Sequence, residues 1–317
     1  MNSSSSYKFH LPFSIQSQYG ISGLTSPVPI PMSNLHASLG TESHGYAITV
    51  TGFPSSDSAF QFLPQAWLGL TAVMLETKAA FSASTLVRPG RPLTVSNPSL
   101  LPNFQGPSVL VDEGEPNVVP EDVPLLTVGV GSSTVSVGLS TDTIIAALAR
   151  GMTDPRASVL FGDARFRTAV DLFAGAAFES SKPARLLTFA MALEVLTPPV
   201  DKHSVVQALI DGWLAELTQA KASYPEGSPE ADALEALERE VLVRRHASIR
   251  WRIRQFVTDA LSTIGDPEAA NLAKRAVQAY DARSRLVHDG SLLDAVADVA
   301  ITDLRTVLER LFSVRLA

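Results

Sequence analysis

The chain changes character near residue 140, and that change limits the folds it can adopt. The first 139 residues are rich in Pro, Gly and Ser and carry short β-type runs, whereas helix-start signals and apolar repeats of helical spacing follow. Strand-rich and helix-rich sections in succession are typical of α+β chains or of separate domains. We therefore predict an α+β fold with a β-rich N-terminal domain over residues 21–139. An all-α, up-and-down helical bundle is predicted over residues 140–317.

Short runs rich in β-branched residues predict the strands of the first domain. They are Tyr46–Val50, Ser108–Val111, Leu125–Val128 and Thr134–Val137. The last two flank Gly129–Ser133, which fits a hairpin connection. The apolar segment from Ala59 to Phe81 leaves a helix and two strands open, because short apolar runs are ambiguous by period alone. Residues 1–20 open with Met-Asn and four serines, and we expect them to form a poorly ordered tail.

Capping residues mark the starts of helices in the second domain. Apolar repeats follow Ser140, Ser181, Ser204, Ser228 and Asp266. The last two of these are followed directly by proline, which is favoured at the first helical position. An apolar stripe predicts the final helix from Leu292 to Phe312. Short connections between such helices make an up-and-down bundle the expected packing.

Composition excludes several kinds of site. The 317 residues include no cysteine, so disulfides, thiolate zinc sites and a cysteine nucleophile are all excluded. The six histidines lack metal-ligand spacing, and there is neither a phosphate-binding Gly-rich loop nor a Gly-x-Ser-x-Gly turn. We therefore expect no metal site and no cofactor, and nothing in the sequence favours a metabolic enzyme.

Charge and hydropathy limit the expected partners. No apolar run reaches the ~18 residues of a membrane span, and the N-terminus does not resemble a secretory signal. We expect a soluble, cytoplasmic protein without a membrane partner. The net charge of −7 argues against a general coat for nucleic acid, which needs many cations to neutralise phosphates. An enzyme that meets RNA at one small site remains compatible with this charge.

The segment from Tyr280 to Gly290 contains a pair of side chains suited to phosphate chemistry. Arg283 and His288 lie five residues apart, and Asp289-Gly290 predicts that the helix ends there. Histidine titrates near neutrality and moves protons, while arginine binds phosphate oxygens in pairs. This chemistry requires no metal. The spacing alone fits equally well a surface arginine and a structural histidine at a helix end.

The segment resembles the R-x4-6-H signature of HEPN domains, and most closely that of the ApeA-like branch. Residues 280–290 read Tyr-Asp-Ala-Arg-Ser-Arg-Leu-Val-His-Asp-Gly, where the branch has Tyr-Asp-x-Arg-Ser-x-x-Val-His-x-Gly. Residues 185–196 and 248–256 are similar to the family's apolar helix ending in Ala-Leu-Glu and to its Ser-x-x-x-Arg-Ile helix, in the same order. The resemblance covers about residues 160–315 and does not extend to the N-terminal half.

The resemblance implies a helical domain that dimerises and brings two arginine–histidine pairs into one cleft. Active members of the family are metal-independent endoribonucleases, often in toxin–antitoxin, anti-phage or CRISPR-linked defence. By position, His288 would be the acid/base and Arg283 the phosphate contact. RNA, a second copy of the chain, and an antitoxin or trigger protein are the partners this implies. The alternative is a non-catalytic HEPN module for dimerisation, RNA binding or protein interaction.

Four residues are assigned supporting roles around the predicted pair: Glu194, Tyr280, Asp281 and Ser284. Glu194 lies in an apolar helix, so it either pairs inside the bundle, with arginine as the favoured partner, or ends its helix at a wet edge. Ser284 departs from the Asn, Asp or His that is frequent after the arginine in other HEPN branches. Glu194 and Asp281 are therefore the candidates to orient His288.

The predicted RNA contacts are Arg285 and two arginines one helical turn apart, Arg250 and Arg254. The last two belong to a basic cluster that has a second interpretation, a solvated helix face whose arginines pair with nearby glutamates. Those glutamates are Glu235, Glu238 and Glu240. Trp251, within the cluster, is expected to anchor the core and not to stack on RNA bases.

Overall fold

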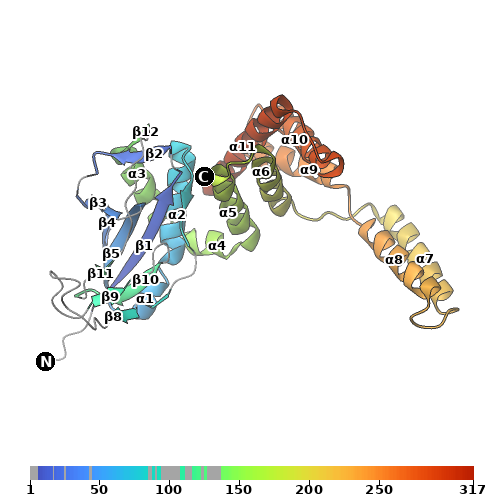
Figure 1. Cartoon of the computed structure of the whole chain (residues 1–317), viewed down its shortest axis with the longest axis horizontal. Helices are drawn as coiled ribbons and strands as arrows, with labels where there is room; N and C mark the ends of the chain where they lie inside the picture. Colours follow the sequence, from blue (N-terminus) through green and yellow to red (C-terminus); the bar gives the residue numbers. More distant parts are fainter. Residues whose placement is uncertain are drawn as a thin grey trace. The chain divides into compact units, whose positions relative to one another are not determined.

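The computed structural model describes residues 6–16, 18–24, 26–42, 45–84, 88–89, 91–93, 108–110, 116–122, 125–126 and 137–317. An N-terminal region built on a mainly antiparallel sheet precedes a C-terminal helical region (Figure 1). The predicted α+β class is therefore confirmed.

The main sheet has the strand order β3-β4-β5-β1-β10-β7, and β6 also pairs with β1. Its strands are β1 (Tyr7–Ile15), β3 (Val28–Ile30), β4 (His36–Glu42), β5 (Gly45–Phe53), β6 (Phe81–Ser82), β7 (Arg88–Pro89) and β10 (Asn117–Pro120). All of these pairings are antiparallel except that of β7 with β10. Smaller sheets join β12 (Val137–Ser140) to β2 (Tyr19–Ser22), and β9 (Ser108–Leu110) to both β8 (Arg91–Leu93) and β11 (Leu125–Leu126).

The N-terminal segment supplies an inner strand of the main sheet. Strand β1 lies between β5 and β10. Its apolar residues Phe9, Leu11, Phe13 and Ile15 alternate along the sequence and are buried, as are His10 and Pro12 between them. This period of two is that of a strand, and the serine-rich start of the chain obscured it. The expectation of a poorly ordered tail was therefore wrong for the residues of β1 and β2. Residues 1–5 lie outside the described part of the chain.

The other predicted strands agree only in part with the observed ones. Strands β5 and β9 confirm two of the predicted runs, while β11 covers the start of the third and β12 begins at the last residue of the fourth. The predicted hairpin at residues 129–133 lies outside the described residues. Strand β11 pairs with β9, and β12 pairs with β2. The apolar segment whose structure was left open is helical, with α1 (Ser56–Phe60) followed by α2 (Leu63–Thr77).

Helix α2 joins the sheet to the helices that follow it. Phe62, just before α2, stacks edge-on against Phe9 of β1 and Phe53 of β5. Trp67 of α2 makes edge-on contacts with Phe161 of α4 (Ala157–Gly162) and Phe166 of α5 (Ala164–Phe178), with ring centroids 5.6 and 5.9 Å apart. Such aromatic pairs add about 0.5–1.5 kcal/mol each beyond their buried area.

Helices α2 and α3 (Thr141–Met152) pack backbone against backbone. A Cβ atom added to Gly151 of α3 would lie 2.6 Å from the carbonyl oxygen of Leu68 and 2.7 Å from Cα of Gly69, both in α2. Only glycine allows so close an approach. The first helices after residue 140 therefore belong to the same core as the sheet.

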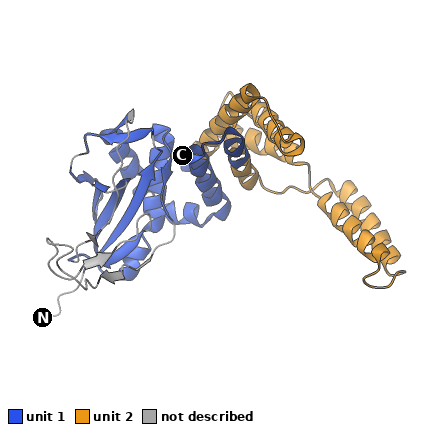
Figure 2. Cartoon of the chain, in the orientation of Figure 1, with its two compact units in different colours: residues 1–188, 315–317 blue, residues 189–314 orange. Residues whose placement is uncertain are grey.

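The chain divides into two compact units, residues 1–188 with 315–317 and residues 189–314 (Figure 2). The division falls within α6 (Lys182–Leu196) and not at residue 140 as the sequence predicted, because α3, α4 and α5 pack with the sheet unit.

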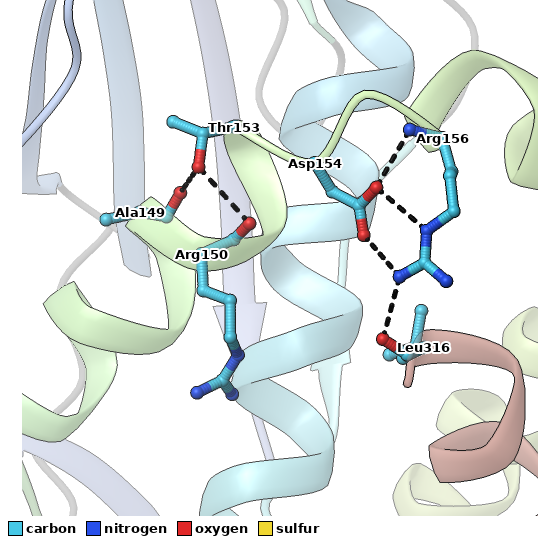
Figure 3. Close-up of polar contacts among 6 residues, drawn as sticks. All are labelled: Ala149, Arg150, Thr153, Asp154, Arg156 and Leu316. Atoms are coloured by element: carbon cyan, nitrogen blue, oxygen red, sulfur yellow. Dashed lines mark hydrogen bonds and ion pairs between the residues drawn. The ribbon is translucent and has the colours of Figure 1, made fainter.

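Arg156 links the C-terminal residues to the sheet unit (Figure 3). Its guanidinium binds Asp154 through Nε at 3.1 Å and Nη2 at 2.8 Å, and Nη2 also donates to the carbonyl oxygen of Leu316 at 2.9 Å.

The second unit is a helical bundle. Besides the end of α6 it contains α7 (Ser204–Lys221), α8 (Pro229–Val243), α9 (Ile249–Thr263), α10 (Ala269–Asp289) and α11 (Asp294–Leu316) up to residue 314. Helices α7 and α8 form an antiparallel hairpin (Figure 1). The segments before α7 and after α8 pair through Asp201 and His246, and the N–H of Lys202 donates to the carbonyl oxygen of Arg245 at 2.9 Å.

Helix starts agree closely with the predicted capping residues. Ser140 and Ser228 cap α3 and α8, and Ser181 precedes α6. Helix α7 begins at Ser204, capped by the His203 side chain, while α10 begins three residues after Asp266. No helix in the described ranges is both long enough and apolar enough to cross a membrane.

Candidate functional site

Helix α10 carries both residues of the predicted pair. It runs without a break to Asp289 and ends at Gly290, whose φ of 70° lies in the left-handed region that favours glycine. Arg283 and His288 are therefore separated by about 140° around the helix axis and about 7.5 Å along it. No hydrogen bond or ion pair joins these two described residues.

Arg283 points to a polar cluster formed with Glu194 of α6 and Tyr280 of α10. The Tyr280 hydroxyl donates to Oε1 of Glu194 at 2.7 Å, and Nη2 of Arg283 lies 3.7 Å from Oε2. The guanidinium also stands 5.5 Å from the centre of the Tyr280 ring. The Arg283 and Glu194 side chains keep 26% and 30% of their surface exposed. Glu194 therefore has partners inside the bundle and an open side, so both of its predicted environments are present.

The cluster changes the acidity of the Tyr280 phenol. Burial, the hydrogen bond to Glu194 and the charge of that carboxylate together raise the pKa of Tyr280 to about 12. Arg283 and Arg252 oppose this rise, since their positive charges favour the phenolate. Arg252 of α9 therefore belongs to the same electrostatic environment.

Replacing Glu194 with glutamine is expected to lower the pKa of Tyr280, because the amide accepts the hydrogen bond without carrying a negative charge. In the wild type the folded pKa exceeds the unfolded value of about 10. The stability contributed by the protonated phenol is thus present below pH ~10 and is lost as the pH rises through ~12. Ultraviolet absorbance titration, with Tyr280→Phe to identify the phenol, measures the change. Identical titration curves for the wild type and Glu194→Gln would contradict the expectation. The control is Glu216→Gln on α7, which is expected to leave the pKa of Tyr280 unchanged.

The predicted RNA-contact arginines divide into engaged and unpaired residues. Arg250 of α9 forms an ion pair with Asp281 of α10, with Nη2 and Oδ2 2.9 Å apart. Arg254 and Arg285 are exposed and form no ion pair with any described residue. The interpretation that the basic cluster pairs with Glu235, Glu238 and Glu240 is wrong. The first two pair with Lys221, and Glu235 also with Arg239, while Glu240 forms no ion pair with any described residue.

His288 is exposed in the last turn of α10. Glu194 and Asp281, the two candidates to orient it, bind Tyr280 and Arg250 respectively, and neither of these described residues forms a hydrogen bond or ion pair with the imidazole. Ser284 is partly buried one turn before His288 and forms no hydrogen bond through its hydroxyl within the described ranges. The structure therefore brings Arg283, Tyr280 and Glu194 together and leaves His288 apart from them.

One residue of α9 differs from its predicted role, and a second was not predicted to have one. Trp251 keeps 49% of its surface exposed, so the prediction that it anchors the core was wrong. The buried face of α9 is Ile253, Val257 and Leu261, and a residue two positions before Ile253 points about 200° away from that face. Arg252, which sequence reasoning left aside, lies close enough to the polar cluster for its charge to lower the pKa of Tyr280. Arg252 could have been identified from the sequence, because it is adjacent to Ile253 and so lies at the margin of the buried face of α9.

A groove of about 440 Å³ runs between α10 and α11 beside the motif. Alanines such as Ala279, Ala282 and Ala295 form much of its wall, and Asp281 and Arg285 contribute charged groups. In the described residues, no group of three or more His, Asp or Glu side chains is arranged to hold a metal ion.

Comparisons of the chain with protein-family models, with curated proteins and with solved structures gave no match. The resemblance to HEPN domains therefore rests on the sequence motifs alone, whose residues lie in or next to α6, α9 and α10.

Proposed function

We propose that this protein is a HEPN-type, metal-independent endoribonuclease. The observation that carries the proposal is the arrangement of α10, which holds Arg283 beside an open polar cluster and His288 exposed in its last turn, two residues before Gly290. Arg283 is partly solvent-facing, so a phosphate can approach it. His288 is accessible to an RNA hydroxyl, and imidazole is the side chain best suited to proton transfer near neutral pH.

The chemistry needs one group to move protons and one to neutralise charge. His288 removes the proton from a 2′-hydroxyl, whose oxygen attacks the adjacent phosphorus. The bond to the 5′ oxygen breaks, and that oxygen takes up a proton. The products are a 2′,3′-cyclic phosphate and a 5′-hydroxyl. Arg283 stabilises the negative charge that develops on the phosphate, and the unpaired Arg254 and Arg285 bind neighbouring phosphates.

The separation of Arg283 and His288 around α10 favours a site completed by a second chain. Residues about 140° apart on one helix face different directions, so a homodimer formed through the helical domain is part of the proposal. Such an enzyme acts in the cytoplasm as a defence or toxin effector. An enzyme that cuts cellular RNA requires control, and we assign the sheet unit to binding an antitoxin or a trigger protein.

A second candidate is a non-catalytic HEPN module for dimerisation, RNA binding or protein interaction. It is favoured by the engagement of Arg283 with Glu194 and by the absence of an orienting partner for His288 among the described residues. In that case RNA or protein binding is retained when the histidine is replaced.

Incubation of the purified chain with total cellular RNA in EDTA tests the proposed activity. We expect cleavage that persists without divalent metal and leaves 2′,3′-cyclic phosphate ends, identified by their resistance to ligation until the cyclic phosphate is removed. Products with 3′-hydroxyl ends, or activity that depends on Mg²⁺, would contradict the mechanism. Intact tRNA, rRNA and mRNA after prolonged incubation would favour the non-catalytic module.

A further inference from the structure

The α7–α8 hairpin buries little of its apolar surface. Of the apolar side chains of α7 and α8, only Ile210 and Ala231 are buried, while Leu214, Leu217 and Leu234 are partly buried. Most other apolar side chains of the hairpin face solvent. A two-helix unit of this kind gains stability from burying its apolar side against another element.

Four exposed apolar residues share one side of the hairpin. Val206, Leu209 and Trp213 follow helical spacing along α7 and are 36%, 56% and 52% exposed. Leu237 of α8, 44% exposed, follows the partly buried Leu234 by three residues, as Trp213 follows the buried Ile210, and in an antiparallel pair this equal offset places both on the same side. These four residues form a continuous stripe across the two helices, which we call the hairpin stripe. An exposed apolar patch of this kind marks an interaction site.

The charges of the two sides differ. On the side away from the hairpin stripe, acidic residues are paired: Asp211 with Arg245, and Glu235 with both Lys221 and Arg239, at 3.4 and 3.7 Å. Around the stripe, Glu216, Glu230 and Glu240 are exposed and form no ion pair with any described residue. On the side away from the hairpin stripe, the acidic residues form ion pairs within the chain. On the side of the stripe, exposed apolar residues are bordered by acidic residues without ion pairs among the described residues.

We propose that the hairpin stripe and its acidic rim are the docking site for a basic amphipathic helix of a partner protein. Two antiparallel helices with a common apolar side accept a third helix between them, and its apolar residues cover the stripe. Lysine or arginine residues flanking that apolar face meet Glu216, Glu230 and Glu240, which fixes the orientation of the partner helix.

The negative charge of the hairpin argues against other binding partners at this site. Residues 204–243 contain eight acidic and two basic residues, so a second hairpin would place like charges opposite each other. Nucleic acid and an anionic membrane surface are repelled for the same reason. This docking site is independent of Arg283 and His288, and the proposal stands whether or not the chain cleaves RNA.

The probe is a synthetic amphipathic helical peptide built from leucine and lysine, compared with a peptide in which glutamate replaces every lysine. Calorimetry with the full chain is expected to show binding of the lysine peptide and none of the glutamate peptide. In a Trp251→Phe chain, binding shifts the emission of Trp213 to shorter wavelength, while Trp67 is buried and reports little.

Leu209→Ser combined with Trp213→Ser is expected to weaken peptide binding about tenfold or more. Glutamine at positions 216, 230 and 240 is expected to weaken it and to reduce its dependence on salt. Val299→Ser, which changes a residue of α11 that is 61% exposed, is the matched control and leaves affinity unchanged. Circular dichroism confirms that each variant is folded.

Three results would overturn the proposal. The first is no binding, or equal binding of the two peptides. The second is lysine-peptide binding that the double serine variant retains. The third is self-association of the wild-type chain in sedimentation equilibrium that Leu209→Ser with Trp213→Ser abolishes, since the stripe then belongs to a second copy.

Discussion

Replacing His288 with alanine is expected to lower the rate of RNA cleavage by about 10²- to 10⁴-fold, the usual contribution of a general acid–base residue. The substitution removes the only group assigned to proton transfer and alters an exposed position, so the fold is expected to remain intact. The measurement is single-turnover cleavage of a labelled RNA in EDTA, with RNA affinity determined in parallel. Affinity is expected to change little, because Arg283, Arg254 and Arg285 are still present.

The matched control for this prediction is His36→Ala, which removes an exposed histidine from strand β4. It is expected to leave both rate and affinity unchanged. If the His288→Ala chain cleaves RNA as fast as the wild type, His288 is not the acid–base group and the catalytic assignment fails. If both chains bind RNA and neither cleaves it, the non-catalytic module is the better description.

Gly151→Ala is expected to destabilise the sheet unit by about 1–3 kcal/mol, the usual cost of overpacking a close contact. The new methyl group would overlap the backbone of α2 at Leu68 and Gly69, and backbone atoms cannot rotate away as a side chain can. Urea denaturation, followed through the buried Trp67, measures the shift in midpoint at constant slope.

Gly175→Ala provides the comparison within the same unit. Gly175 lies inside α5, and a Cβ added there meets nothing within 4 Å. Alanine is the better helix former, so this substitution is expected to stabilise the chain by about 0.5–1 kcal/mol. A Gly151→Ala chain as stable as the wild type would show that α2 and α3 separate without cost, contrary to their close packing.

Sequence patterns predicted the helical caps better than they predicted the sheet. Ser140 and Ser228 act through bonds to residues three positions away, so local sequence contains the whole signal. Helix α2 is buried almost all round, and that removes the one-sided period by which a helix is identified. The division within α6 depends on contacts of Trp67 with Phe161 and Phe166, which are distant in sequence.

The candidate site shows the same limit. The end of α10 at Gly290 was predictable, because a glycine after a run of helical spacing is a local signal. The bond between Tyr280 and Glu194 joins residues 86 positions apart, and the ion pair between Arg250 and Asp281 joins two helices. Both depend on how α6, α9 and α10 pack, which no local pattern specifies.

The pairing at the base of the α7–α8 hairpin has a consequence for how the protein can vary. The segment before α7 and the segment after α8 are joined by two backbone hydrogen bonds, from the N–H of Lys202 to the carbonyl oxygen of Arg245 at 2.9 Å and from the N–H of Ala247 to that of Val200 at 2.8 Å. An excursion that starts and ends at one point behaves as an insertion, since its length and surface can change without altering the path of α6 or α9. The surface of the hairpin can therefore change in sequence independently of the motif on α10.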